Sequence, residues 1–138
     1  MRTRPLLARF VRTRRGTVSV EFVLWLPIFL VIMAFTADAC KLYLTQANMY
    51  DVARDTARRI SIGQYCTSTD AQGYARSQLL YPLTYSYAIT VGDDNVVTIS
   101  TPIKDASVFG LMAEYGGFTD KTLSAVVTMP KEPGACST

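Results

Sequence analysis

The chain has 138 residues, an apolar content of 49% and a formal net charge of +3, which leave room for only one modest folded domain. Six of its fourteen basic residues are arginines before position 17 with no acid among them, so the rest of the chain carries a net charge of −3. The basic balance therefore belongs to a short leader, and the scattered lysines and arginines of the remainder give no support for a nucleic-acid partner.

Residues 22–37 form an uncharged apolar run after the arginine-rich leader. As a helix this run rises about 24 Å, which is short of the roughly 20 residues that a membrane span needs. Residues 17–20 before Glu21, or 39–44 beyond Asp38, could extend it, and either extension places a carboxylate at the membrane edge. A small domain has no interior that would surround such a helix on every face. The sequence therefore predicts one transmembrane helix, with the leader in the cytoplasm and the C-terminal part outside.

Residues 1–37 also have the layout of a secretory signal, with a basic region, an apolar region and small residues at Ala37 and Ala39. Cleavage there would release a soluble protein. The helical pattern continues past residue 40 without a break, which favours a retained helix.

The junction between leader and apolar run carries the most informative motif. Gly16 is followed five residues later by a lone acid, Glu21, with Phe22 next to it and Pro27 inside the run. A carboxylate that enters lipid costs about 2 to 3 kcal/mol, so an acid at this place indicates a function. The segment resembles the TadE-like minor pilins of the tight-adherence (Flp) pilus, which share a prepilin-type N-terminus. The resemblance covers roughly residues 14–50.

This resemblance implies that a prepilin peptidase cuts after Gly16, so that the mature chain begins at Thr17, while Glu21, Phe22 and Pro27 occupy the family's assembly positions. The new α-amino group of Thr17 would pair with Glu21 of a neighbouring subunit and set the register between helices. It further implies a minor pilin or pseudopilin of the bacterial inner membrane, working with other pilins and pilus-assembly proteins. The alternative is an uncleaved single-pass anchor that presents a small periplasmic binding domain.

Apolar residues recur at helical spacing from Leu42 to Ile62, so one helix is predicted over 17–62, with Gly63 as its stop. Asp38 and Lys41 lie three residues apart and predict a salt bridge at the membrane boundary. Asp55 predicts further pairs with Arg58 and Arg59.

The remaining residues predict a small module. A helix is expected over 69–80, capped by Ser68, Thr69 or Asp70 and ended by Pro82. Strands are expected over 85–91 and 96–101, joined by a hairpin turn at 92–95, with a last strand over 122–129. Residues 103–118 are predicted to be a loop with a helical turn, and residues 131–138 a tail. The apolar side chains of this loop are expected to cover the core, or alternatively to meet another subunit: Val108, Phe109, Leu111 and Met112.

The predicted fold class is α+β, with a long N-terminal transmembrane helix followed by a small antiparallel-sheet module, the lollipop shape of pilin subunits. The chain is expected to have three parts: a leader over 1–16, a transmembrane and assembly helix over 17–62, and a periplasmic module over 63–138.

Cys66 and Cys136 both lie in the exported part, where an oxidising compartment would allow them to form a disulfide, leaving Cys40 at the membrane boundary. The chain has no histidine, which excludes histidine-based catalysis and histidine metal sites. Asp93, Asp94 and Asn95 lack the spacing of a calcium loop and fit a hairpin turn. We therefore expect no enzymatic activity, no cofactor and no small-molecule substrate.

Overall fold

The computed structural model describes residues 17–82, 84–92, 94–133 and 135. The chain divides into two compact units, Met1–Ala34 and Phe35–Thr138. The predicted leader, residues 1–16, lies outside the described residues.

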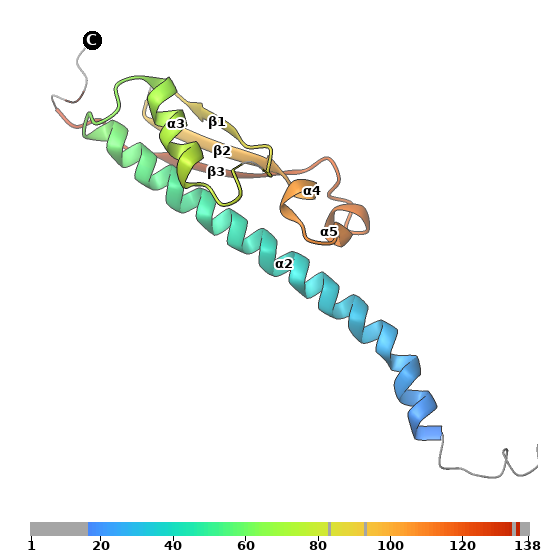
Figure 1. Cartoon of the computed structure of the whole chain (residues 1–138). Coiled ribbons are helices and arrows are strands. Elements are labelled where there is room, and N and C mark those ends of the chain that lie inside the picture. Colours follow the sequence, from blue (N-terminus) through green and yellow to red (C-terminus); the bar gives the residue numbers. More distant parts are fainter. Residues whose placement is uncertain (1–16, 83, 93, 134, 136–138) are drawn as a thin grey trace, which may run out of the picture. The chain divides into compact units, whose positions relative to one another are not determined.

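A single long helix, α2 (Thr17–Ser61), runs through the N-terminal half of the chain (Figure 1). It confirms the helix that was predicted over 17–62. Pro27 lies inside it, where the ring nitrogen has no hydrogen to donate to the carbonyl of Val23. The described part of the first unit is the segment 17–34 of α2. The second unit begins at Phe35, inside the same helix.

The second unit contains an antiparallel sheet of three strands in the order β1 (Ala88–Val91), β2 (Val96–Pro102) and β3 (Thr122–Thr128). Ile99 of β2 lies opposite Ile89 on one side and Ala125 on the other. The predicted hairpin is confirmed, because the Gly92 N–H donates to the Val96 carbonyl at 2.9 Å across the turn. Together with the long helix, this sheet confirms the predicted α+β class.

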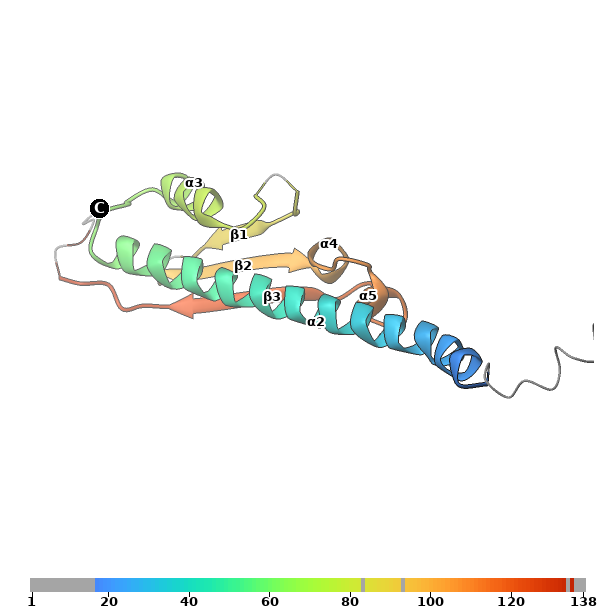
Figure 2. The same ribbon diagram turned by 60° about the horizontal axis from the view of Figure 1, so that its bottom comes forward.

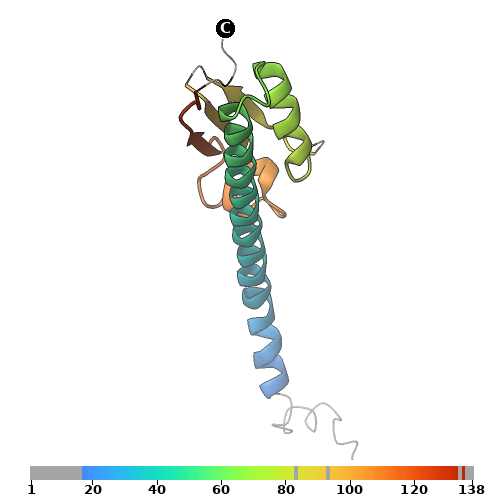
Figure 3. The ribbon, with the colours of Figure 1, turned by 90° about the vertical axis from the view of Figure 1, so that its left-hand side faces the viewer.

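Helix α2 and the shorter α3 (Ser68–Gln78) pack against the same face of the sheet, and Figures 2 and 3 show the two helices beside the strands. The helices contribute both small and large side chains to the core, such as Ala53 and Ala57 beside Met49. The other face of the sheet carries exposed residues such as Thr90, Ser124 and Val126. The buried cluster between helices and sheet contains, besides Tyr85 and Tyr87, residues Met49, Val52, Ala53, Ala57, Ala75, Leu79, Val97, Ile99 and Ala125.

Helix α3 begins one residue earlier than predicted and its expected cap is wrong. Ser68 and Asp70 lie inside the first turn and so cannot be the cap. The N-cap residue is Thr67, whose side chain makes no capping hydrogen bond. The acid in that turn still interacts favourably with the helix dipole. The helix ends at Gln78, four residues before Pro82.

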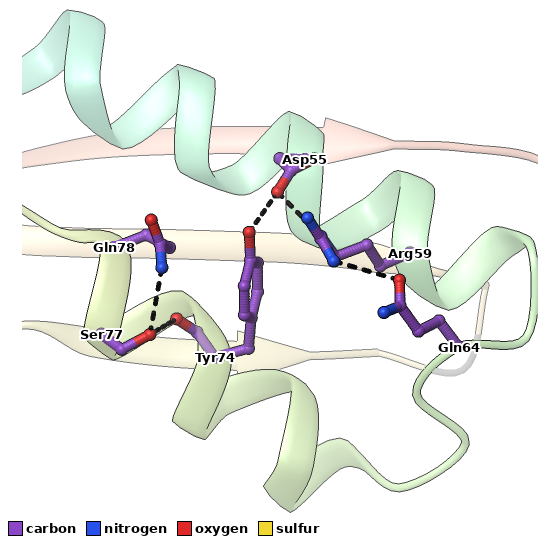
Figure 4. A network of polar contacts seen from close by, with 6 residues as sticks. All are labelled: Asp55, Arg59, Gln64, Tyr74, Ser77 and Gln78. Carbon is purple, nitrogen blue, oxygen red and sulfur yellow. Dashed lines mark hydrogen bonds and ion pairs between the residues drawn. The ribbon is translucent and has the colours of Figure 1, made fainter.

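A polar network fastens α3 to α2 (Figure 4). The Tyr74 hydroxyl donates to Asp55 Oδ2 at 2.5 Å, and Arg59 Nε donates to the same oxygen at 2.9 Å. The Arg59 guanidinium also lies 4.4 Å from the centre of the Tyr74 ring and donates to Gln64 Oε1 at 3.1 Å. The predicted pair between Asp55 and Arg59 is therefore formed, and it holds a residue of the neighbouring helix as well.

The residues after β3 do not form a free tail as far as they are described. Ser61 Oγ, at the end of α2, donates to the Pro130 carbonyl at 2.5 Å, and the Glu132 N–H donates to the Ser61 carbonyl at 3.1 Å. Ala135 is buried. The predicted tail from residue 131 has no helix or strand where it is described, and its backbone is bonded to the end of α2.

Candidate functional site

The predicted processing and assembly residues lie at the start of α2. Thr17 is the first residue of the helix, and Gly16 lies outside the described residues. Glu21 follows one turn after Thr17 and is exposed, as is Phe22 next to it. Residues four apart share one face of a helix, so Glu21 stands on the same side as the first residue.

The helix around these residues is apolar and uncovered. The large apolar side chains from Val20 to Met33 are each between 43% and 69% exposed. The described residues contain one helix that is long and apolar enough to cross a membrane, and the apolar window within it has no buried residue. This excludes the core helix of a soluble domain as an account of the run, and it suggests a single-pass membrane anchor.

The acid at the other end of the apolar run has a different environment from the one predicted. Asp38 is fully buried, and the expected salt bridge to Lys41 is not what satisfies it. Its carboxylate instead lies under the segment between the short helices α4 (Ile103–Ala106) and α5 (Leu111–Glu114). Oδ1 accepts two backbone N–H groups at 2.8 Å each and Oδ2 accepts two at 2.9 and 3.4 Å, from Val108, Phe109, Leu111 and Met112 respectively.

Gly110 makes this arrangement possible. Its φ of 73° lies in the left-handed region, where a side chain is disfavoured, and it separates the two pairs of N–H groups that converge on Asp38. Lys41 turns to the module instead, where its ammonium lies 4.3 Å from the centre of the Tyr81 ring.

The loop held by Asp38 exposes apolar side chains. Val108 is 52% exposed and Phe109 is 61% exposed, so the expectation that they cover the core was wrong. Their backbone N–H groups face the carboxylate, and the side chains stay outside. Leu111 and Met112 are partly buried. Met112 and Phe118 line one side of an apolar groove, with α2 on the other; its lining consists of Ala39, Leu42, Tyr43, Gln46, Ile103, Met112, Phe118 and Leu123.

The cysteines differ in state. Cys66 is disulfide-bonded, and Cys40 is free and exposed on α2. Cys136 lies outside the described residues, so its pairing with Cys66 stays a prediction.

The described residues thus contain an exposed apolar helix with a lone acid near its beginning, followed by a small α+β module, and such a helix suggests a single-pass membrane anchor. The sequence model of the TadE-like protein family matches residues 16–58, which confirms the resemblance over that segment. This match links the chain to tight-adherence pili, to pilus-related protein partners and to a membrane. Searches of curated proteins and of solved structures gave no match.

Sequence reasoning located Glu21 but missed the role of Asp38. An acid between Ala37 and Ala39 at the end of an apolar run was a signal that the carboxylate needs a partner. The nearest cation in the sequence, Lys41, was the obvious choice, and the actual partners are backbone groups 70 to 74 residues away.

Proposed function

We propose that this chain is a minor pilin or pseudopilin that acts in the assembly of a tight-adherence (Flp-type) pilus. In this proposal it is made as a precursor, cut by a prepilin peptidase after Gly16, and inserted in the bacterial inner membrane. The C-terminal module lies in the periplasm and the leader in the cytoplasm.

One coincidence carries the proposal. The match to the TadE-like family begins at Gly16, which is the residue after which the prepilin-type motif predicts the cut. A cut at this place would remove all six arginines of the leader and keep residues 17–61 of α2 in the mature chain. The family match covers less than half of the chain and ends at residue 58, so the sheet lies outside the matched segment.

Cleavage would give Glu21 a partner. It creates an α-amino group on Thr17, and a cation of this kind on one subunit can pair with the exposed Glu21 of the next. Such a pair in a low-dielectric surrounding fixes register, because sliding one helix past the other would leave both charges unpaired. Phe22 and the exposed apolar residues up to Met33 would then pack against neighbouring pilin helices.

The partners in this proposal are the prepilin peptidase, other pilins and the proteins of the pilus-assembly machinery, with no nucleic acid, cofactor or small-molecule substrate. The subunit itself would have no enzymatic activity. Its contribution to cell adhesion would come through the pilus that it helps to build.

The test is the N-terminal sequence of the protein isolated from native membranes. We expect Thr17 as the first residue, and we expect Met1 in cells that lack the prepilin peptidase. A first residue at Met1 or Arg2 in normal cells would support the uncleaved anchor with a periplasmic binding domain. A start near Ala39 or Cys40 would identify a secreted soluble protein and overturn the proposal.

A further inference from the structure

The apolar run is shorter than the hydrocarbon core of a bilayer, and the structure indicates how the span can be lengthened. Residues 22–37 rise about 24 Å as a helix, and the hydrocarbon core of a bilayer is about 30 Å thick. Extending the span to residue 40 gives a rise of about 28 Å, which nearly closes the gap. This extension takes Asp38 into the membrane, where a charged side chain at the lipid face is costly.

Asp38 does not present its charge to the lipid face. The side chain is fully buried and both carboxylate oxygens accept backbone N–H groups, three of them within 2.9 Å. The exposed side chains that follow it on α2 are uncharged, with Cys40 exposed, Tyr43 74% exposed and Leu44 56% exposed, while the partly buried Lys41 turns its ammonium to the Tyr81 ring. The carboxylate therefore belongs to the interior of the protein even where the helix surface is in lipid.

The segment that shields Asp38 is Ser107–Met112, which we call the collar. Because its N–H groups bond to Asp38, the collar lies level with the end of the apolar run, one residue past position 37. Its two most exposed residues are apolar, Val108 and Phe109, and Gly110 turns the backbone between them and α5. Aromatic side chains that are amphipathic or apolar are common at the membrane interface, and Tyr43, Tyr115 and Phe118 are all exposed in this part of the unit.

We propose that the collar is a membrane-contact element, in which Val108 and Phe109 insert into the lipid at the outer edge of the bilayer. The collar and Asp38 then act together: the loop adds apolar surface beside the end of the span, and its N–H groups satisfy the hydrogen-bonding capacity of the carboxylate. The occupant of this surface is lipid because the exposed side chains of α2 at the same level, Cys40, Tyr43 and Leu44, are uncharged. The inference depends on the membrane span but not on cleavage after Gly16 or on pilus assembly.

Charge does not drive this contact. The flanking helices α4 and α5 carry Lys104, Asp105 and Glu114, so the region has no excess of cations that would seek anionic lipid. We therefore expect insertion into uncharged bilayers and no loss on raising the salt concentration.

The test places a spin label on the full chain in vesicles of phosphatidylcholine and phosphatidylethanolamine. The label is attached at Phe109→Cys in a Cys40→Ala background, and Cys40→Ala alone gives the background signal. Oxygen, which concentrates in lipid, should collide with this label several-fold more often than a water-soluble nickel chelate does. The matched control is Ile62→Cys, also an exposed apolar site at 51%, beyond the end of α2, where the preference should reverse.

Two results would overturn the proposal. A label at position 109 that meets the nickel chelate as often as the one at position 62 would show that the collar stays in water. A label that neither reagent reaches would show that protein covers the collar, and spin–spin broadening that disappears on dilution with unlabelled chain would identify a second copy as the cover. Because Phe109 is mostly exposed, the label leaves the packing of the unit intact.

Discussion

Glu21 and Asp38 stand at the two ends of the apolar run and differ in what their carboxylates can still do. Asp38 is fully buried and bonded to four N–H groups of its own chain, so it is not available to another molecule. Glu21 is exposed on the first part of α2. Of these two acids, only Glu21 is placed to pair with a second subunit.

Glu21→Ala should abolish or strongly reduce pilus assembly while membrane insertion stays intact. The substitution removes the proposed partner of the new N-terminal amine, and it makes the apolar helix cheaper to insert by about 2 to 3 kcal/mol. The measurement is the amount of surface pili, together with the amount of the subunit in the membrane fraction. Asp51→Ala, which removes an exposed acid from the same helix inside the second unit, is the matched control and should assemble normally. Normal piliation with Glu21→Ala would argue strongly against the pilin function.

Ion pairs between an acid and a base were predicted on α2 from their spacing along the helix, and the pair between Asp55 and Arg59 forms whereas the pair between Asp38 and Lys41 does not. Asp55 and Arg59 pair as their four-residue spacing predicted, because both side chains lie on the same helix face. Asp38 and Lys41 had a spacing as favourable, but a loop far along the chain offers Asp38 four aligned donors. Spacing predicts which residues can meet on one helix, and it contains no information about a segment that folds back from elsewhere.

At the level of the elements, the contact between α2 and α3 depends on two titrating groups. The Tyr74 hydroxyl bond, and then the Arg59 bond, lower the pKa of Asp55. The bond to Asp55, and then burial, raise the pKa of Tyr74. A lowered carboxyl pKa stabilises the fold above the unfolded value of about 4, and this contribution is lost as the pH falls through the folded value. A raised phenol pKa stabilises the fold below about 10, and its contribution is lost as the pH rises further.

Tyr74→Phe should therefore destabilise the second unit most between about pH 4 and pH 10. We expect a loss of about 1 kcal/mol, less than the roughly 1.5 to 3 kcal/mol typical of a hydrogen bond to a charged group, because Asp55 and Arg59 are partly exposed to solvent. The measurement is denaturant unfolding of the full chain in detergent at several pH values, with the difference from the unmodified chain shrinking below pH 4. Tyr115→Phe, at a residue 75% exposed, is the control and should change little. An undiminished difference at low pH would show that packing, and not this network, holds α3.

The elements themselves were largely predictable. Alternating apolar residues and a turn of small polar residues predicted β2 and the hairpin, and an apolar helical pattern predicted the whole of α2. The first strand was predicted from residue 85, but β1 begins only at Ala88. The prediction failed for Ser107–Met112 because an apolar loop was assumed to bury its side chains. Here the buried groups are the backbone N–H donors, which the sequence does not distinguish from any others.

At the scale of the whole molecule, the second compact unit begins at Phe35, well inside α2. Four residues of its core come from the helix before Gly63: Met49, Val52, Ala53 and Ala57. The sheet and α3 thus pack on a surface that α2 provides.

A fragment of residues 35–138 should fold, and a fragment of residues 63–138 should not. Losing a large buried side chain such as Met49 costs about 2 to 5 kcal/mol, and the shorter fragment loses the entire helix surface against a total stability of about 5 to 15 kcal/mol. The measurement is circular dichroism with the dispersion of amide signals in NMR spectra. Met49→Ala in the longer fragment should fall between the two. A well-dispersed spectrum from the shorter fragment would show that the sheet and α3 are sufficient by themselves.

The placement of the aromatic residues gives the unlabelled protein two separate optical reporters. Its only tryptophan, Trp25, belongs to the first unit and is 53% exposed on the apolar helix, whereas all eight tyrosines belong to the second unit. Tryptophan emission therefore reports the polarity around the apolar helix, and tyrosine absorbance reports the packing of the sheet and its helices. A titration with denaturant that changes the tyrosine signal first would show that the module unfolds while the helix keeps its lipid surroundings.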